Sequence, residues 1–246
     1  MRPCLSLLLA YGVLAGCASP PSDPNGTWIN RAAIEAASEH GSLREALLAY
    51  GPNLEWQIDG QRQQASFSNG FELGEGQLVG EDLGRFRIDF YGDYHEYLSL
   101  DGDELAQQAS GVWPEQRFVR ADSVAPADAP PGSAFEQALY RSYLGGTWTI
   151  RQGQGEGGLV LFHSDGQVQG LPGAERYALC LAGDCAAMSG EHDSLWLQLG
   201  EQGQAWLFEH DGPQLSIFEA LNRAPFDEMP DYQKGAQRWL LERRSQ

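Results

Sequence analysis

The sequence predicts a mainly β protein made of two small antiparallel β-barrels or sandwiches in tandem, with a short helical insertion in the first. Two observations support this prediction. Short segments in which apolar and polar residues alternate are separated by Gly, Asp and Asn turns. The two halves of the 246-residue chain also carry the same landmarks in the same order, which is typical of tandem copies of one module.

Three landmarks recur in the two halves. Each half opens with Gly-Thr-Trp, later reaches an Asp-Gly turn that precedes a leucine, and then has a last candidate strand. The paired positions are 25–28 and 145–148, 101–105 and 211–215, and 116–120 and 237–241. With the Pro- and Ala-rich stretch between the halves, they divide the chain into a first module at 25–121, a linker at 122–132 and a second module at 133–246.

The strands are predicted from alternation and the helices from capping patterns. Leu54 and Trp56 alternate with polar residues, and Asn69-Gly70 is a typical hairpin connection because both residues tolerate a positive φ. Helix is expected at 31–50, interrupted at Gly41, as an insertion positioned to plug one end of the first barrel. A second helix, capped by Ser133, is expected to lead into the second module.

The N-terminus predicts export and lipidation. Residues 1–16 combine Arg2 with an apolar run that is too short to span a bilayer, as in a secretory signal peptide. The segment Leu14-Ala15-Gly16-Cys17 resembles the lipobox of bacterial lipoproteins. The resemblance implies that Cys17 carries a diacylglyceryl group and an acyl chain such as palmitate, and that 17–24 is a lipidated tether. The alternative is an ordinary signal peptide in which the cysteine occurs by chance.

By the same resemblance, the absence of Asp after the cysteine implies an anchor in the outer membrane, on its periplasmic face. Because Cys4 leaves with the signal peptide and Cys17 is lipidated, Cys180 and Cys185 remain as the cysteines able to pair. An oxidising periplasm favours a disulfide between them across a tight turn. A redox-active pair and a zinc site are the alternatives, and they need a different spacing or additional ligands.

The Gly-x-Trp openings, the strand-turn at 162–166 and the closing Asp-Gly hairpins together resemble bacterial lipocalin-like domains, so both modules are expected to be calycin-like. The resemblance implies that Trp28 and Trp148 seal the floor of each barrel and serve structure rather than a ligand. It carries over no ligand-binding residue, because nothing beyond these landmarks matches.

The composition and motifs argue against several functions. A formal net charge of −18 repels phosphate backbones, so nucleic-acid binding is not expected. The sequence contains no nucleophile elbow, zinc-protease motif, phosphate-binding loop or dinucleotide fingerprint, so we assign no catalytic residue, metal or cofactor. Three histidines have acidic neighbours, at 163–165, 191–193 and 209–211, but each triplet falls where a turn is expected.

One segment, Tyr94-His95-Glu96-Tyr97, is singled out as a possible ligand-lining element. In a strand, Tyr94 and Glu96 share one face and His95 and Tyr97 share the other, so one pair would line a cavity if the barrel is hollow. The alternative is ordinary cross-strand pairing on a half-exposed surface.

These observations predict a lipid-anchored protein that faces the periplasm and acts without catalysis. It is expected to be a binding or accessory protein for a small apolar ligand or for another envelope protein. Two alternatives stay open. One is an acidic inhibitor or immunity-type protein that docks on a basic hydrolase. The other is an unrecognised hydrolase that uses a carboxylate or histidine pair.

Overall fold

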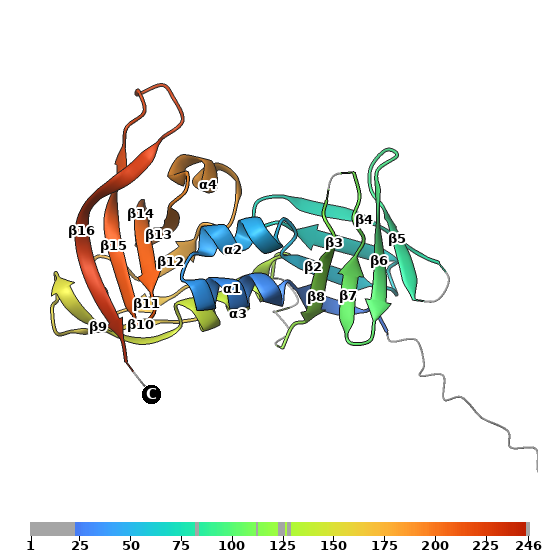
Figure 1. Cartoon of the computed structure of the whole chain (residues 1–246), viewed down its shortest axis with the longest axis horizontal. Helices are drawn as coiled ribbons and strands as arrows, with labels where there is room; N and C mark the ends of the chain where they lie inside the picture. The colour runs from blue at the N-terminus through green and yellow to red at the C-terminus, as the bar shows by residue number, and fades with distance from the viewer. Residues whose placement is uncertain (1–22, 82–83, 112, 123–125, 127–128, 245–246) are drawn as a thin grey trace, which may run out of the picture.

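The computed structural model describes residues 23–81, 84–111, 113–122, 126 and 129–244. The chain forms two eight-stranded antiparallel sheets in tandem, with helices between them (Figure 1). The predicted fold class, mainly β with two barrel-like sheets in sequence, is therefore confirmed. The signal peptide at 1–16 and Cys17 lie outside the described residues.

The first sheet is a closed barrel in which each strand pairs with the next along the chain and the last pairs with the first. Asn69-Gly70 follows β3 and Asp101-Gly102 stands at the end of β6, so both dipeptides form turns as expected. Both glycines have a positive φ. The strands are β1 (Gly26–Ile29), β2 (Glu55–Asp59), β3 (Gln64–Ser68), β4 (Leu73–Gly80), β5 (Arg85–Asp89), β6 (His95–Asp101), β7 (Glu104–Gln107) and β8 (Gln116–Arg120).

The second sheet has the strand order β11-β10-β9-β16-β15-β14-β13-β12. Its edge strands approach each other through backbone hydrogen bonds from Val168 N to Glu175 O (2.9 Å) and from Tyr177 N to Gly166 O (2.8 Å), so the sheet nearly closes. The strands are β9 (Gly146–Gly153), β10 (Leu159–Phe162), β11 (Val168–Gln169), β12 (Arg176–Leu179), β13 (Asp193–Leu199), β14 (Gln202–Asp211), β15 (Gln214–Asn222) and β16 (Tyr232–Arg243).

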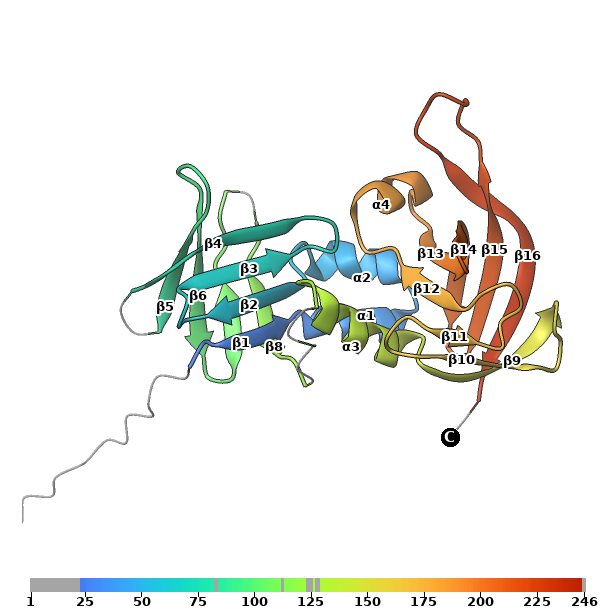
Figure 2. The same ribbon diagram turned by 180° about the vertical axis from the view of Figure 1, so that it is seen from behind.

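The helices that separate the sheets come from both halves of the chain. They are α1 (Arg31–His40), α2 (Leu43–Tyr50) and α3 (Ser133–Tyr143), and two opposite views place all three between the sheets (Figures 1 and 2). The insertion at 31–50 is two helices, as the interruption at Gly41 predicted. They are divided at Gly41, whose φ of 77° ends α1. A Cβ at Gly41 would lie 2.1 Å from the carbonyl oxygen of His210 on β14, so only glycine fits this close approach.

The cap of α3 differs from the prediction. The hydroxyl of Ser133 donates to the carbonyl oxygen of Pro130 (2.7 Å) and caps nothing. Instead, the fully buried Glu55 carboxylate of β2 accepts from the backbone N–H groups of Gly132 and Phe135, both at 2.9 Å. A residue of the first barrel therefore caps the helix that leads into the second sheet.

The cores of the two sheets are made of side chains from different kinds of element. The barrel core consists of ten side chains from its own strands, none more than 8% exposed: Trp28, Trp56, Ile58, Ala65, Phe67, Leu78, Ile88, Leu98, Leu105 and Phe118. The core of the second sheet also contains α1, α2 and α3, with Ile34, Leu43 and Phe135 among its members. The apolar face of the helical insertion packs into the core of the second sheet. The insertion also lies against the end of the first barrel, because Ile29 of β1 joins the same cluster and Gln116 Nε2 of β8 donates to Tyr50 O of α2 (3.0 Å).

The Gly-Thr-Trp landmark builds the same local structure in both sheets. Trp28 on β1 and Trp148 on β9 are buried, and each indole N–H donates to the carbonyl oxygen four residues earlier. Arg120 of β8 and Arg243 of β16 stack on these rings, 4.2 and 4.5 Å from the ring centroids. Each arginine also donates to carbonyl oxygens three and five residues before its tryptophan. We call this arrangement the Trp–Arg clamp.

The predicted disulfide is also present. Cys180 and Cys185 are bonded, with their Cα atoms 5.9 Å apart. Cys180 directly follows β12, and Cys185 lies in α4 (Gly183–Ser189). The bond therefore ties the short helix α4 to the end of an edge strand.

Candidate binding surfaces

The segment singled out as possible ligand lining is divided between the inside and the outside of the first barrel. Glu96 on β6 is 1% exposed and belongs to the interior. His95 is exposed and Tyr97 is half-buried on the other face, with their rings in edge contact at 5.3 Å. The alternation of faces that the sequence predicted is therefore present. Because His95 points outward, it shares no cavity with Glu96.

Glu96 is held by hydrogen bonds from its neighbours. One carboxylate oxygen accepts from the hydroxyl groups of Tyr94 and Ser110 (3.0 Å for Ser110), and the other accepts from Gln107 Nε2 (3.4 Å). The Tyr94 oxygen accepts from Trp113 Nε1 at 2.6 Å. Burial, and then the neighbouring Glu96 carboxylate, raise the pKa of the Tyr94 phenol, which keeps it a hydrogen-bond donor. Glu96 is thus the acceptor at the centre of a buried network.

The network continues toward the end of the barrel that faces the helices. Gln107 Oε1 accepts from Asn53 Nδ2 (2.9 Å) and from Trp56 Nε1 (3.2 Å). The rings of Phe67 and Trp113 lie in edge contact beside it, with centroids 6.3 Å apart. Polar and aromatic side chains occupy this end of the barrel, and the apolar core of ten side chains occupies the rest.

Two of the three histidine triplets meet at one hollow beside the α1–α2 turn. The hollow has a volume of about 370 Å³, and its lining includes His40, His192, Asp193 and His210. Asp193 is engaged structurally, because its carboxylate accepts from the backbone N–H groups at 43 and 44 (2.9 and 2.6 Å) at the start of α2. Among the described residues, no group of three or more His, Cys, Asp or Glu has the arrangement of a metal site.

His210 is a half-buried histidine of this hollow with a shifted pKa. Neither ring nitrogen has a hydrogen-bond partner within the described part of the chain. The rings of Tyr143 and Trp148 pack against it at 4.7 and 5.8 Å. Burial, and then the positive charge of Arg243, lower the pKa of His210 to about 4. At neutral pH the imidazole is uncharged and serves as a packed ring.

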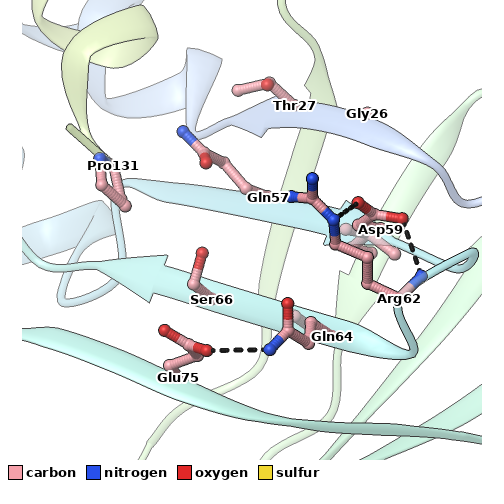
Figure 3. Close-up of a pocket in the computed structure, with 11 residues that line it drawn as sticks. Gly26, Thr27, Gln57, Asp59, Arg62, Gln64, Ser66, Glu75 and Pro131 are labelled. Atoms are coloured by element: carbon pink, nitrogen blue, oxygen red, sulfur yellow. Dashed lines mark hydrogen bonds and ion pairs between the residues drawn. The ribbon is translucent and has the colours of Figure 1, made fainter. Parts of the chain in front are cut away.

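A polar groove lies on the outer face of β1 to β4 (Figure 3). Its side chains pair with one another: Arg62 with Asp59 (3.6 Å between Nε and Oδ2), and Gln64 Nε2 with Glu75 Oε1 (3.1 Å). The lining includes Thr27, Gln57, Asp59, Arg62, Gln64, Ser66, Glu75 and Pro131. The groove therefore presents paired polar groups to solvent rather than a group poised for catalysis.

Sequence reasoning missed the large apolar side chains that the fold leaves exposed. Phe226 and Tyr91 are fully exposed, at 106% and 102%. Leu48 and Phe71 are also exposed, and they lie near residues 181–183 of the second half of the chain. The signal that could have found Phe226 is its place in a proline-flanked stretch, 225–230, which interrupts the alternation between two strands.

No helix within the described ranges has the length and apolar character needed to cross a bilayer. No protein-family model, curated protein or solved structure matches the chain significantly. The geometry and chemistry of the chain itself therefore carry the functional argument.

Proposed function

We propose that this protein is a lipid-anchored protein of the bacterial envelope that binds another protein through its outer surface and acts without catalysis. The observation that carries the proposal is the filled first barrel. Ten buried side chains and the Glu96 network occupy the space that a ligand-carrying barrel keeps open. Of the two occupants expected from the sequence, a small apolar ligand and an envelope protein, the filled barrel favours the protein.

The second sheet supports the same choice. Its concave side is occupied by α1, α2 and α3, whose apolar side chains belong to its core. Binding groups are then sought on the surface, where Phe226, Phe71 and Leu48 are exposed. Exposed aromatic side chains of this kind are frequent anchors of protein interfaces.

The envelope location rests on the N-terminal sequence. A lipobox ending at Cys17 would place a lipid anchor in the outer membrane with the protein on the periplasmic face. The Cys180–Cys185 disulfide supports an oxidising compartment, because structural disulfides persist there and are rare in the cytosol.

A second candidate function is inhibition of, or immunity to, a basic hydrolase. The net charge of −18 favours it, since an acidic surface accelerates encounter with a basic protein and disfavours acidic partners. In that case the partner is an enzyme with a basic isoelectric point, and the complex suppresses its activity.

The test is crosslinking in cells that make the tagged full chain, followed by purification from the envelope. A Cys17→Ala variant controls for location. We expect a protein partner to copurify with the wild type and to be depleted with Cys17→Ala, and we expect no small molecule in a stoichiometric amount. Release of one equivalent of a lipid or metabolite, without any protein partner, would contradict the proposal.

A further inference from the structure

The hairpin of β15 and β16 extends beyond the strands on either side of it. β14 pairs with β15 as far as Glu219, and β9 pairs with β16 from Trp239 onward. Past these positions the two strands pair with each other as far as Asn222 and Tyr232. This two-stranded segment, residues 220–238, is called the arm. It projects from the second sheet in both views (Figures 1 and 2).

The tip of the arm, residues 222–232, is held in a defined shape. The side-chain oxygen of Asn222 accepts from the backbone N–H groups of Ala224 (2.9 Å) and Asp231 (3.0 Å). Arg223 N donates to Asp231 O (2.8 Å), and Glu228 N donates to the carbonyl oxygen at 225 (3.1 Å). These bonds order the loop without using its apolar side chains, so the loop is organised before anything binds to it.

The ordered tip presents apolar side chains to water. Phe226 is 106% exposed and Met229 is 56% exposed. A fully exposed phenylalanine adds nothing to the core, and its ring is available to fill a pocket on another molecule. Because the loop is already ordered, such binding would lose little conformational entropy.

The residues around Phe226 indicate what kind of pocket fits. Asp227, Glu228 and Asp231 are exposed carboxylates within the tip, and Arg223 is the one basic residue at positions 222–232. The excess negative charge of the tip is repelled by anionic lipid headgroups and by a second copy of this chain, whose net charge is −18. It is complementary to a surface rich in Lys and Arg.

We propose that the arm is a docking element, and that Phe226 inserts into an apolar cleft edged by basic side chains on a partner protein. This inference rests on the proposed protein-binding function and names the element that carries it. Its position agrees with the role, because the described chain begins at β1, at the opposite end of the long axis from the arm (Figure 2). A protein anchored near β1 would present the arm away from its anchor.

The experiment places the photocrosslinker benzoylphenylalanine at position 226 of the full chain in living cells. The matched control carries it at position 91, where Tyr91 is equally exposed on the first barrel. We expect a protein adduct at 226 and none of the same mass at 91. The captured protein should have a basic isoelectric point, and its crosslinked residues should lie in an apolar cleft near Lys or Arg.

The affinity of that purified partner for the detergent-solubilised full chain then decides the role of the ring. Phe226→Ala should raise Kd by roughly 30-fold, as for an interface hot spot, whereas Tyr91→Ala should leave Kd unchanged. Asp227→Asn combined with Glu228→Gln should slow association and weaken its dependence on salt. Since all these side chains are exposed, the variants test binding and not folding.

Four results would overturn the arm as the docking element: a lipid adduct, a self-adduct, the same adduct at 91 and 226, or no adduct at 226. A partner captured by the wild type whose Kd is unchanged by Phe226→Ala also overturns it, and leaves the proposed protein-binding function standing. If no partner is captured at any position, both proposals fail.

Discussion

The two sheets fill their concave sides in different ways. The first closes on itself, and the side chains of its own strands meet in the middle. The second keeps β11 and β12 at its edges and packs around α1, α2 and α3. Two of these helices follow the first strand of the barrel. The barrel core is thus built from its own strands, whereas the core of the second sheet includes α1 and α2 from the first half of the chain.

This difference exists although both sheets carry the same Trp–Arg clamp. Trp28 with Arg120, and Trp148 with Arg243, repeat the same stacking and the same carbonyl contacts. A shared local structure therefore does not determine what fills a sheet.

The largest effects are expected from removing one buried ring from each core. Phe135→Ala in α3 and Phe118→Ala in β8 should each lower the free energy of unfolding by about 3–5 kcal/mol, because both rings are fully buried. Hydrogen exchange should localise the damage, to β9–β16 and the helices for Phe135→Ala and to β1–β8 for Phe118→Ala. If either variant loosens both sheets equally, the two cores are not separable.

The next effect tests the connection between the sheets. Glu55→Gln keeps the shape of the side chain but removes the charge that accepts two N–H groups of α3, and should cost about 2–3 kcal/mol. Burial first, and then the charge of Glu55, raise the pKa of Glu136, so that pKa should fall in the variant. Glu75→Gln, at an exposed carboxylate, is the matched control. Equal stability of wild type and Glu55→Gln would show that the cap contributes nothing.

Reduction of the disulfide should affect the second sheet alone. The Cys180–Cys185 bond closes a short loop, so its loss should cost about 2 kcal/mol, measured by thermal unfolding with and without reductant. Faster hydrogen exchange is expected in α4, with no change in the barrel. A melting temperature that is insensitive to reductant would count against a stabilising role.

The smallest effect is a pH dependence that belongs to the second sheet. The pKa of His210 is lowered to about 4 in the folded state, so the folded protein binds this proton more weakly than the unfolded chain does. The free energy of unfolding should therefore fall as the pH drops from about 6.5 to about 4, by about 1–2 kcal/mol after allowing for partial exposure. His210→Phe should lose this part of the dependence. Identical pH profiles for variant and wild type would refute the assignment.

The features that the sequence predicted correctly are those determined by residues close to one another in the chain. Alternation predicted that Glu96 and His95 lie on opposite faces of their strand, and the short separation of the two remaining cysteines, Cys180 and Cys185, predicted their bond. Turns and the fold class follow from the same local information. Lipidation of Cys17 stays a prediction.

What the sequence could not predict depends on contacts between distant segments. The α3 cap comes from Glu55, on a strand of the other sheet, while the local pattern pointed to Ser133. The packing of the 31–50 helices into the second sheet is also long-range, since an amphipathic pattern shows that a face is buried but not against what. The arm was missed because full exposure of Phe226 follows from where β14 and β9 stop pairing.

The central claim is that both interiors are occupied by the protein's own side chains, so that binding uses the surface. Native mass spectrometry of the full chain, purified from the envelope in mild detergent, tests it most directly. We predict a mass equal to the polypeptide with its covalent modifications, with no adduct released on denaturation. A stoichiometric non-covalent small molecule, displaced when Ala65→Leu adds bulk inside the first barrel, would contradict the account.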